Sequence, residues 1–262
     1  MSTRFVERIA VEIDGDGEAV LMIHGLGGSS NVWTPLLPEF ARMRAIRFDL
    51  PGSARSARVE GPLSIERFAQ AALRVAAAAG VERAHVIAHS LGTIVAFHLA
   101  VTVPKFVRSL ALFGPLLAPA DPVRTALRAR AAKARSEGEA GMQEIADSLV
   151  QAATSGETKA KRPVAIALVR ELLMRQNADG YARTCEALAD AQAADVARIA
   201  CPTLLVTGDE DAVAPTQEVR RIGGQIAGSG VEILRGCGHW TTVEQPEACC
   251  ALLRQFYARR MT

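Results

Sequence analysis

The stretch AHVIAHSLGTIVAF, residues 84–97, places an apolar β-type run directly before an apolar helical run. His89 and Ser90 stand at the junction, and Gly92 follows two residues after the serine. Short apolar runs bounded by turn signals are typical of buried strands, and longer ones of helices. The stretch therefore predicts a strand, a sharp turn at Ser90 and a helix. Alone, the junction fits two interpretations: a nucleophilic serine on a strained turn, or a serine that caps the helix.

The same alternation of short β-like runs and longer helical runs extends in both directions from this stretch. We expect strands at residues 4–13, 19–24, 44–49, 84–88, 107–113, 203–207 and 231–235. Strands that alternate with helices predict an α/β fold, with a mostly parallel central sheet flanked by helices. The Asp-Gly pairs of DGDG, residues 14–17, predict a hairpin between the first two strands.

The alternation stops at Pro115 and resumes after residue 192. Residues 116–192 contain no strand-like run and several Ala-, Arg- and Glu-rich helical segments. The sequence therefore predicts one α/β core, made of residues 1–115 and 193–262, with an inserted helical cap at 116–192. Because open α/β sheets bind ligands at the carboxyl ends of their strands, we expect the cap to lie over that edge.

Three chemically reactive residues each follow a predicted strand. Ser90 follows the strand at 84–88, Asp211 follows TLLVT and His239 follows VEILR. Their order along the chain, Ser, Asp, His, is that of the α/β-hydrolase triad. In this interpretation Ser90 attacks a carbonyl, His239 transfers the proton and Asp211 orients the imidazole. Asp209 is the alternative acid, because GDED offers more than one carboxylate.

Five motifs occur in the order and approximate spacing found in one large family. They are HGLGGSSNVW, FDLPGSARS, AHSLGT, GDEDAVAP and GCGHW. In these motifs the chain resembles the α/β-hydrolase superfamily, and the resemblance covers nearly all of the sequence outside the helical insertion. It implies an α/β-hydrolase fold. The motif G-x-x-D-x-x-x-P favours Asp211 over Asp209 as the acid.

The resemblance also implies an oxyanion hole. In acyl transfer, fixed backbone N–H groups stabilise the negative charge that develops on the carbonyl oxygen. By analogy, the donors are the amides of Leu26 and Leu91. His24 is expected to support the loop that carries Leu26. We expect Gly25, His89 and Trp240 to contact the substrate.

Two features indicate which reaction of this superfamily to expect: the serine at the turn and a run of residues in the insertion. The run N-x-x-G-Y-x-x-x-C-E-A-L at Asn177–Leu188 is similar to 3-oxoadipate enol-lactonases. Two features depart from them: the loop HGLGG is the generic form, and residues 116–192 contain no tryptophan. We therefore expect a serine hydrolase of carboxylic esters or lactones, with enol-lactone-like substrates among the candidates. The alternatives are a C–C bond hydrolase, an acyltransferase or a non-catalytic small-molecule receptor.

Composition narrows the range of partners. The chain has 262 residues, with 30 basic and 28 acidic side chains and a formal net charge of +2. Without a dense basic block or a long apolar segment, we expect a small-molecule ligand rather than nucleic acid or a membrane. Five cysteines without metal-ligand spacing favour a cytoplasmic protein with no metal. No dinucleotide fingerprint is present, so we expect no cofactor. The sequence gives no prediction of oligomeric state.

Overall fold

The computed structural model describes residues 3–57 and 59–258. Within these residues the chain forms one eight-stranded sheet in the order β1-β2-β4-β3-β5-β6-β7-β8. The strands are β1 (Arg4–Val6), β2 (Ile9–Asp14), β3 (Glu18–Ile23), β4 (Met43–Phe48), β5 (Ala84–His89), β6 (Val107–Phe113), β7 (Thr203–Gly208) and β8 (Gly230–Leu234). In sheet order, each pair of neighbours from β4 to β8 is parallel. Strand β2 is antiparallel to both of its neighbours, β1 and β4. The predicted mostly parallel α/β sheet is therefore confirmed.

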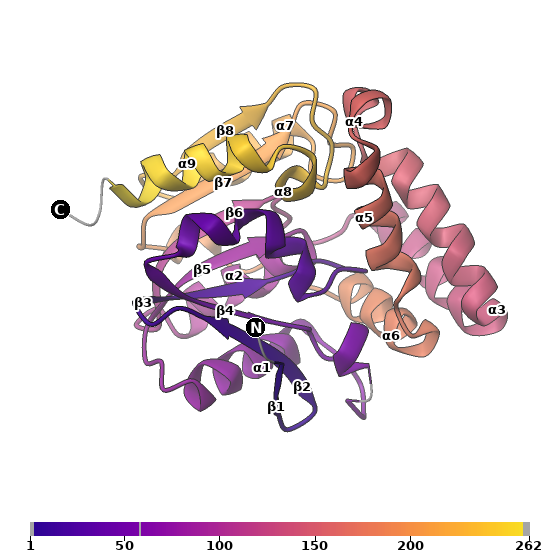
Figure 1. Cartoon of the computed structure of the whole chain (residues 1–262), viewed down its shortest axis with the longest axis horizontal. Coiled ribbons are helices and arrows are strands. Elements are labelled where there is room, and N and C mark those ends of the chain that lie inside the picture. The colour runs from indigo at the N-terminus through magenta and orange to yellow at the C-terminus, as the bar shows by residue number, and fades with distance from the viewer. Residues whose placement is uncertain (1–2, 58, 259–262) are drawn as a thin grey trace.

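Helices cover both faces of the sheet (Figure 1). The elements outside the helical insertion are η1 (Ser30–Phe40), η2 (Ala54–Ser56), α1 (Ile65–Ala78), α2 (Leu91–Thr102), η3 (Val196–Arg198), α7 (Thr216–Gln225), α8 (Thr241–Glu244) and α9 (Pro246–Ala258). Helix α9 contacts η1, and α1 contacts α2. Strand β5 lies between β3 and β6, and all six of its residues are buried because the sheet and both helical layers surround them.

Two expectations about the first strands are wrong. The DGDG turn does not close a hairpin, because β4 lies between β2 and β3 and pairs with both. Every residue of β4 is buried or half-buried, which suits an interior strand of the sheet. Strand β4 therefore separates β2 from β3. The strand expected at 4–13 is divided into β1 and β2, which pair with each other around a turn at Glu7, where φ is 51°.

The segment between β6 and β7 is helical. It contains α3 (Asp121–Ala153), α4 (Gly156–Lys161), α5 (Pro163–Met174) and α6 (Ala178–Ala189). Helix α3 packs against α5 and α6, and the four helices gather beside one end of the sheet, on the right of Figure 1. The expected boundaries of the core include residues 1–2, 58 and 259–262, which lie outside the described residues.

Candidate active site

Ser90 occupies a strained turn between β5 and α2. Its backbone has φ 52° and ψ −122°, a conformation that non-glycine residues rarely adopt. The turn is tight, because a β-carbon on Gly92 would lie 2.3 Å from the carbonyl oxygen of Ile23. In the described structure the Ser90 side chain makes no capping bond to α2, which argues against the interpretation of Ser90 as a helix cap.

His239 and Asp211 form a buried pair. The Nδ1–H of His239 donates to Asp211 Oδ2 at 2.9 Å, which leaves Nε2 on the other side of the ring. The backbone N–H groups of Val213 and Ala214 each donate to Asp211 Oδ1 at 2.8 Å. Burial opposes ionisation of Asp211, but the imidazole and these backbone donors outweigh it and lower the pKa to about 2. By contrast, Asp209, the alternative acid, is exposed.

One cavity of about 550 Å³ brings the predicted residues together. Ser90 and His239 line it with Leu26, His89 and Trp240. Its outer wall comes from the helical insertion, from the turn after β7 and from the start of α7. The residues are Leu116, Leu117, Ala118, Pro119, Ala120, Val123, Ala126, Leu127, Arg130, Leu149, Ala153, Leu188, Ala212, Val213, Pro215 and Glu218. The cavity therefore lies between the carboxyl end of the sheet and the helices.

Three of the expected site residues do not belong to the lining that the described residues form. Asp211 contacts His239 rather than the cavity. Leu91 is fully buried at the first position of α2, where helix amides lack a partner within the helix. Gly25 packs against the nucleophile turn, since a β-carbon on it would lie 2.8 Å from Ser90 Cβ.

The loop after β3 is held from two sides. The Leu50 amide donates to His24 Nε2 at 2.9 Å, so His24 carries its proton on Nδ1 and donates it to the Gly25 carbonyl at 2.8 Å. From the end of α5, the Gln176 amide donates to the carbonyl oxygens of Gly27 and Gly28 at 3.2 and 3.1 Å. The main chain around Leu26 is therefore fixed by the nearby His24 side chain and by the Gln176 side chain from a distant part of the sequence.

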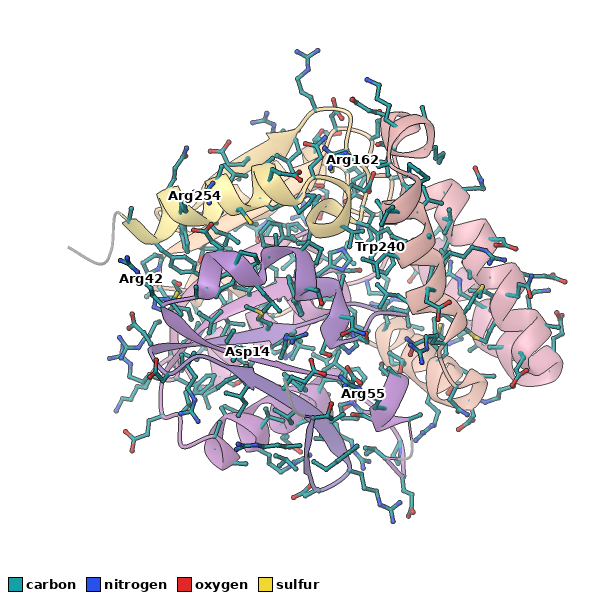
Figure 2. All side chains as sticks on the ribbon, viewed as in Figure 1. Asp14, Arg42, Arg55, Arg162, Trp240 and Arg254 are labelled. Carbon is teal, nitrogen blue, oxygen red and sulfur yellow. The ribbon has the colours of Figure 1, made fainter. Side chains whose placement is uncertain are left out.

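His89 and Trp240 form an aromatic floor next to His239. The His89 ring centroid lies 4.9 Å from that of His239 and 5.2 Å from that of Trp240. The Nε2–H of His89 donates to the His239 carbonyl at 2.9 Å. Burial lowers the pKa of His89 to about 3, so the ring is neutral near pH 7. Figure 2 labels Trp240, which lies between the sheet and α5.

Glu244 and Gln176 also contact the candidate site, and neither was predicted from the sequence. Glu244 is fully buried and accepts hydrogen bonds from both sides of His239. Gln176 connects α5 to the loop after β3. Neither belongs to a recognised motif, although Glu244 lies only five positions after His239 and Gln176 directly precedes the run at Asn177.

Among residues 3–57 and 59–258, no group of three or more His, Cys, Asp or Glu side chains is placed to hold a metal ion. All five cysteines are free thiols. In the part of the chain that the structure describes, no helix combines the length and the apolar character needed to cross a membrane.

Comparison with known proteins identifies the family. The family profile described as "alpha/beta hydrolase fold" matches residues 18–246. The chain belongs to this family. The match includes the strained turn at Ser90 and the Asp211–His239 pair of this α/β hydrolase.

Several relatives of the α/β hydrolase carry hydrolase names. "Putative carbamate hydrolase RutD" of Azorhizobium caulinodans is 42% identical over 102 residues, which are 38% of this chain and only 38% of that protein. The protein of the same name from Stutzerimonas stutzeri is 27% identical, over 90% of this chain and 89% of the relative. Among solved structures, the enol-lactonase from Burkholderia xenovorans LB400 shares the fold, with a TM-score of 0.90 and 24% identity over 98% of this chain and 100% of that chain.

Proposed function

We propose that this α/β hydrolase is a serine hydrolase of carboxylic esters or lactones. One observation carries the proposal: a serine on a strained turn and a histidine bonded to a buried carboxylate line the same cavity. A nucleophile, a base and a group that orients the base are what acyl transfer requires. The hydrolase names of the relatives support the same reaction class.

In the proposed mechanism, Ser90 Oγ attacks the carbonyl carbon while His239 Nε2 takes its proton. The Asp211 carboxylate stabilises the imidazolium through Nδ1–H. The amides of Leu26 and Leu91 are the proposed donors to the oxyanion. His239 then returns the proton to the leaving alcohol, or to the ring oxygen of a lactone, and water hydrolyses the acyl-enzyme by the same steps.

The cavity favours an apolar acyl group that carries a negative charge at its far end. Leucine, valine and alanine side chains dominate the wall, which also contains Arg130 and Glu218. The Glu218 carboxylate already accepts a hydrogen bond from Arg221 Nε at 2.8 Å. Within the described residues no carboxylate forms an ion pair with Arg130, whereas its neighbour Arg128 pairs with Asp190 at 2.6 Å. An enol-lactone with a carboxylate substituent has this combination of groups, and an enol-lactonase shares the fold.

We further propose that residues 116–192 act as a cap. Their helices supply much of the cavity wall opposite Ser90, including Leu127, Leu149 and Leu188. An apolar wall keeps bulk solvent away from the reacting groups and strengthens the electrostatic interactions inside the site.

A hydrolysis panel with Ser90→Ala tests the function. The panel contains p-nitrophenyl esters of short and long acids, simple lactones and 3-oxoadipate enol-lactone. We expect kcat of Ser90→Ala to fall by about 10⁴- to 10⁶-fold, because triad residues act as a unit. Ser109→Ala changes another buried serine, which bonds His85 at 2.7 Å, and is expected to retain native kcat.

The panel separates mechanism from substrate. Turnover by Ser90→Ala within about tenfold of the native rate contradicts the serine mechanism. If turnover requires Ser90, the substrate with the highest kcat/KM decides between a lactonase and an esterase. Two additions to the panel, a diketone and an alcohol acceptor, test the alternative reactions: cleavage of the diketone, or acyl transfer to the alcohol in preference to water, indicates one of them.

A further inference from the structure

The loop that carries His239 is held at its backbone by four hydrogen bonds. The N–H groups of Gly238 and Trp240, on either side of the histidine, donate to Glu244 Oε2 at 3.1 Å and to Glu244 Oε1 at 3.0 Å. The His239 N–H donates to the Ala153 carbonyl at 2.9 Å, and its carbonyl accepts from His89 Nε2 at 2.9 Å. Glu244 therefore supplies both bonds that flank the proposed base.

Glu244 also reaches the helical insertion. Its Oε2 accepts from the Ser155 N–H and from the Thr158 hydroxyl, each at 2.8 Å. These two residues lie at the start of α4, directly after α3 ends. One carboxylate thus connects the histidine loop to the junction of α3 and α4.

The environment of Glu244 is unusual for a carboxylate. Its exposed fraction is 0%, and none of the described Lys, Arg or His side chains forms an ion pair with it. Burying a carboxylate is unfavourable unless hydrogen bonds compensate, and here four neutral donors do so. All four partners are N–H or O–H donors, so both oxygens of the Glu244 side chain act as acceptors.

Packing at Gly238 shows how closely the histidine loop fits against Glu244 and the junction of α3 and α4. A β-carbon on Gly238 would lie 2.8 Å from each of three atoms: the Ala153 carbonyl oxygen, Glu244 Oε1 and the Ser155 nitrogen. Only glycine allows the histidine loop to lie directly against the junction of α3 and α4. The loop therefore cannot move independently of Glu244 and the helices.

We propose that Glu244 is a positioning residue that fixes the main chain on both sides of His239 and ties it to the junction of α3 and α4. This inference rests on the proposed function, in which His239 is the base. Asp211 holds only the Nδ1 edge of the ring, so the position of Nε2 also depends on the backbone that Glu244 holds. A displacement of about 1 Å at a catalytic group can lower the rate about 10²-fold.

Glu244→Gln tests the proposal, because it preserves the shape of the side chain. The new amide places one NH₂ group against an N–H donor, so at least one bond to Gly238, Trp240, Ser155 or Thr158 is lost. We expect kcat on a p-nitrophenyl ester to fall by about 10- to 100-fold with KM within about twofold of native. The matched control is Glu247→Gln, which changes an exposed glutamate that pairs with Arg162 at 3.3 Å, and it should retain native kcat.

A spectroscopic measurement makes the test independent of the substrate. In isotope-labelled protein, the His239 Nδ1–H proton that bonds Asp211 is expected to give a protected NMR signal. We expect this signal to broaden or disappear in Glu244→Gln while thermal unfolding still shows a folded protein. A role in stability alone would lower the melting temperature and leave both this signal and kcat unchanged.

A second variant covers the case in which Glu244→Gln does not fold. Thr158→Val removes one donor to Glu244 and leaves the carboxylate in place, and we expect a several-fold loss of kcat with the same broadening. A folded Glu244→Gln with native kcat and a native Nδ1–H signal overturns the proposal. Failure of the proposed function gives a different result, namely turnover that does not depend on Ser90.

Discussion

The Nδ1–H of His24 donates to the carbonyl oxygen of Gly25 at 2.8 Å. The Gly28 N–H donates to the same oxygen at 3.0 Å, so this carbonyl cannot turn freely. In a trans peptide the carbonyl and the following N–H point in opposite directions. By holding the Gly25 carbonyl, His24 therefore fixes the direction of the Leu26 N–H, the proposed oxyanion donor. Burial lowers the pKa of His24, which keeps the ring neutral and able to accept from Leu50.

His24→Phe is expected to weaken oxyanion stabilisation. The phenyl ring retains the volume but loses both hydrogen bonds, so the Gly25–Leu26 peptide is held by Gly28 alone. We expect kcat to fall by up to about 10²- to 10³-fold, the effect of losing one oxyanion donor, with little change in KM. Stopped-flow acylation with a p-nitrophenyl ester measures this loss. An unchanged acylation rate in the folded variant would show that His24 does not set the oxyanion donor.

Gly92 and Ala88 provide a test of how tightly the turn at Ser90 packs. Gly92→Ala places a methyl group 2.3 Å from the Ile23 carbonyl oxygen, and backbone cannot move aside as a flexible side chain does. We expect a loss of stability of about 3 kcal/mol or more, or failure to fold. The opposite change, Ala88→Gly, two residues before Ser90, removes a methyl group and should cost only about 1 kcal/mol through backbone entropy. Urea denaturation of both variants compares the two; equal stability would mean that the turn has room for a side chain at Gly92.

Acid is expected to destabilise the protein through His89. Its pKa is about 3 in the folded protein, below the usual 6.5, so the unfolded chain binds a proton that the folded chain does not. Stability is therefore fully present above pH 6.5 and is lost as the pH falls toward 3. Linkage predicts a decrease in the free energy of unfolding of about 2 kcal/mol between pH 7 and pH 5. Urea titrations at each pH measure it.

His89→Gln should reduce this pH dependence, because glutamine does not titrate. The control is His98→Gln, which changes a partly exposed histidine bonded to the Gln192 carbonyl at 3.0 Å, and it should keep the native slope. If the free energy of unfolding of His89→Gln falls with pH as steeply as that of the native protein, exclusion of a proton from His89 is not the cause of the pH dependence.

The sequence predicted the order of strands along the chain better than their order across the sheet. Apolar runs and turn residues are local signals, so the position of β5 and the turn at Ser90 followed from residues 84–97. Pairing is not local: the Asp-Gly turn favoured a hairpin, but β4 lies between β2 and β3. Which strand occupies the centre depends on burial on both faces, and residues 14–17 carry no information about it.

The candidate site was likewise only partly predictable from the sequence. Ser90, Asp211 and His239 could be predicted because each follows a strand and has a reactive side chain. Gln176 was missed because its role depends on a contact with Gly27, 149 positions away. Glu244 was missed because its burial depends on the fold, including a contact with Ser155, 89 positions away. A glutamate on a short helix is usually solvent-exposed, so only the folded structure shows that this one is buried.

Arg130 is expected to select substrates with a negative charge on the acyl chain. Mono-p-nitrophenyl glutarate and p-nitrophenyl valerate have acyl chains of the same length and differ in the terminal carboxylate. In Arg130→Met we expect kcat/KM for the glutarate to fall by about 10- to 100-fold, the value of a charge-assisted hydrogen bond, and that for the valerate to stay within about twofold of native. Arg128→Met, at an exposed position paired with Asp190, is the control and should leave the ratio of the two substrates unchanged. An equal loss for both esters would mean that Arg130 shapes the cavity without recognising charge.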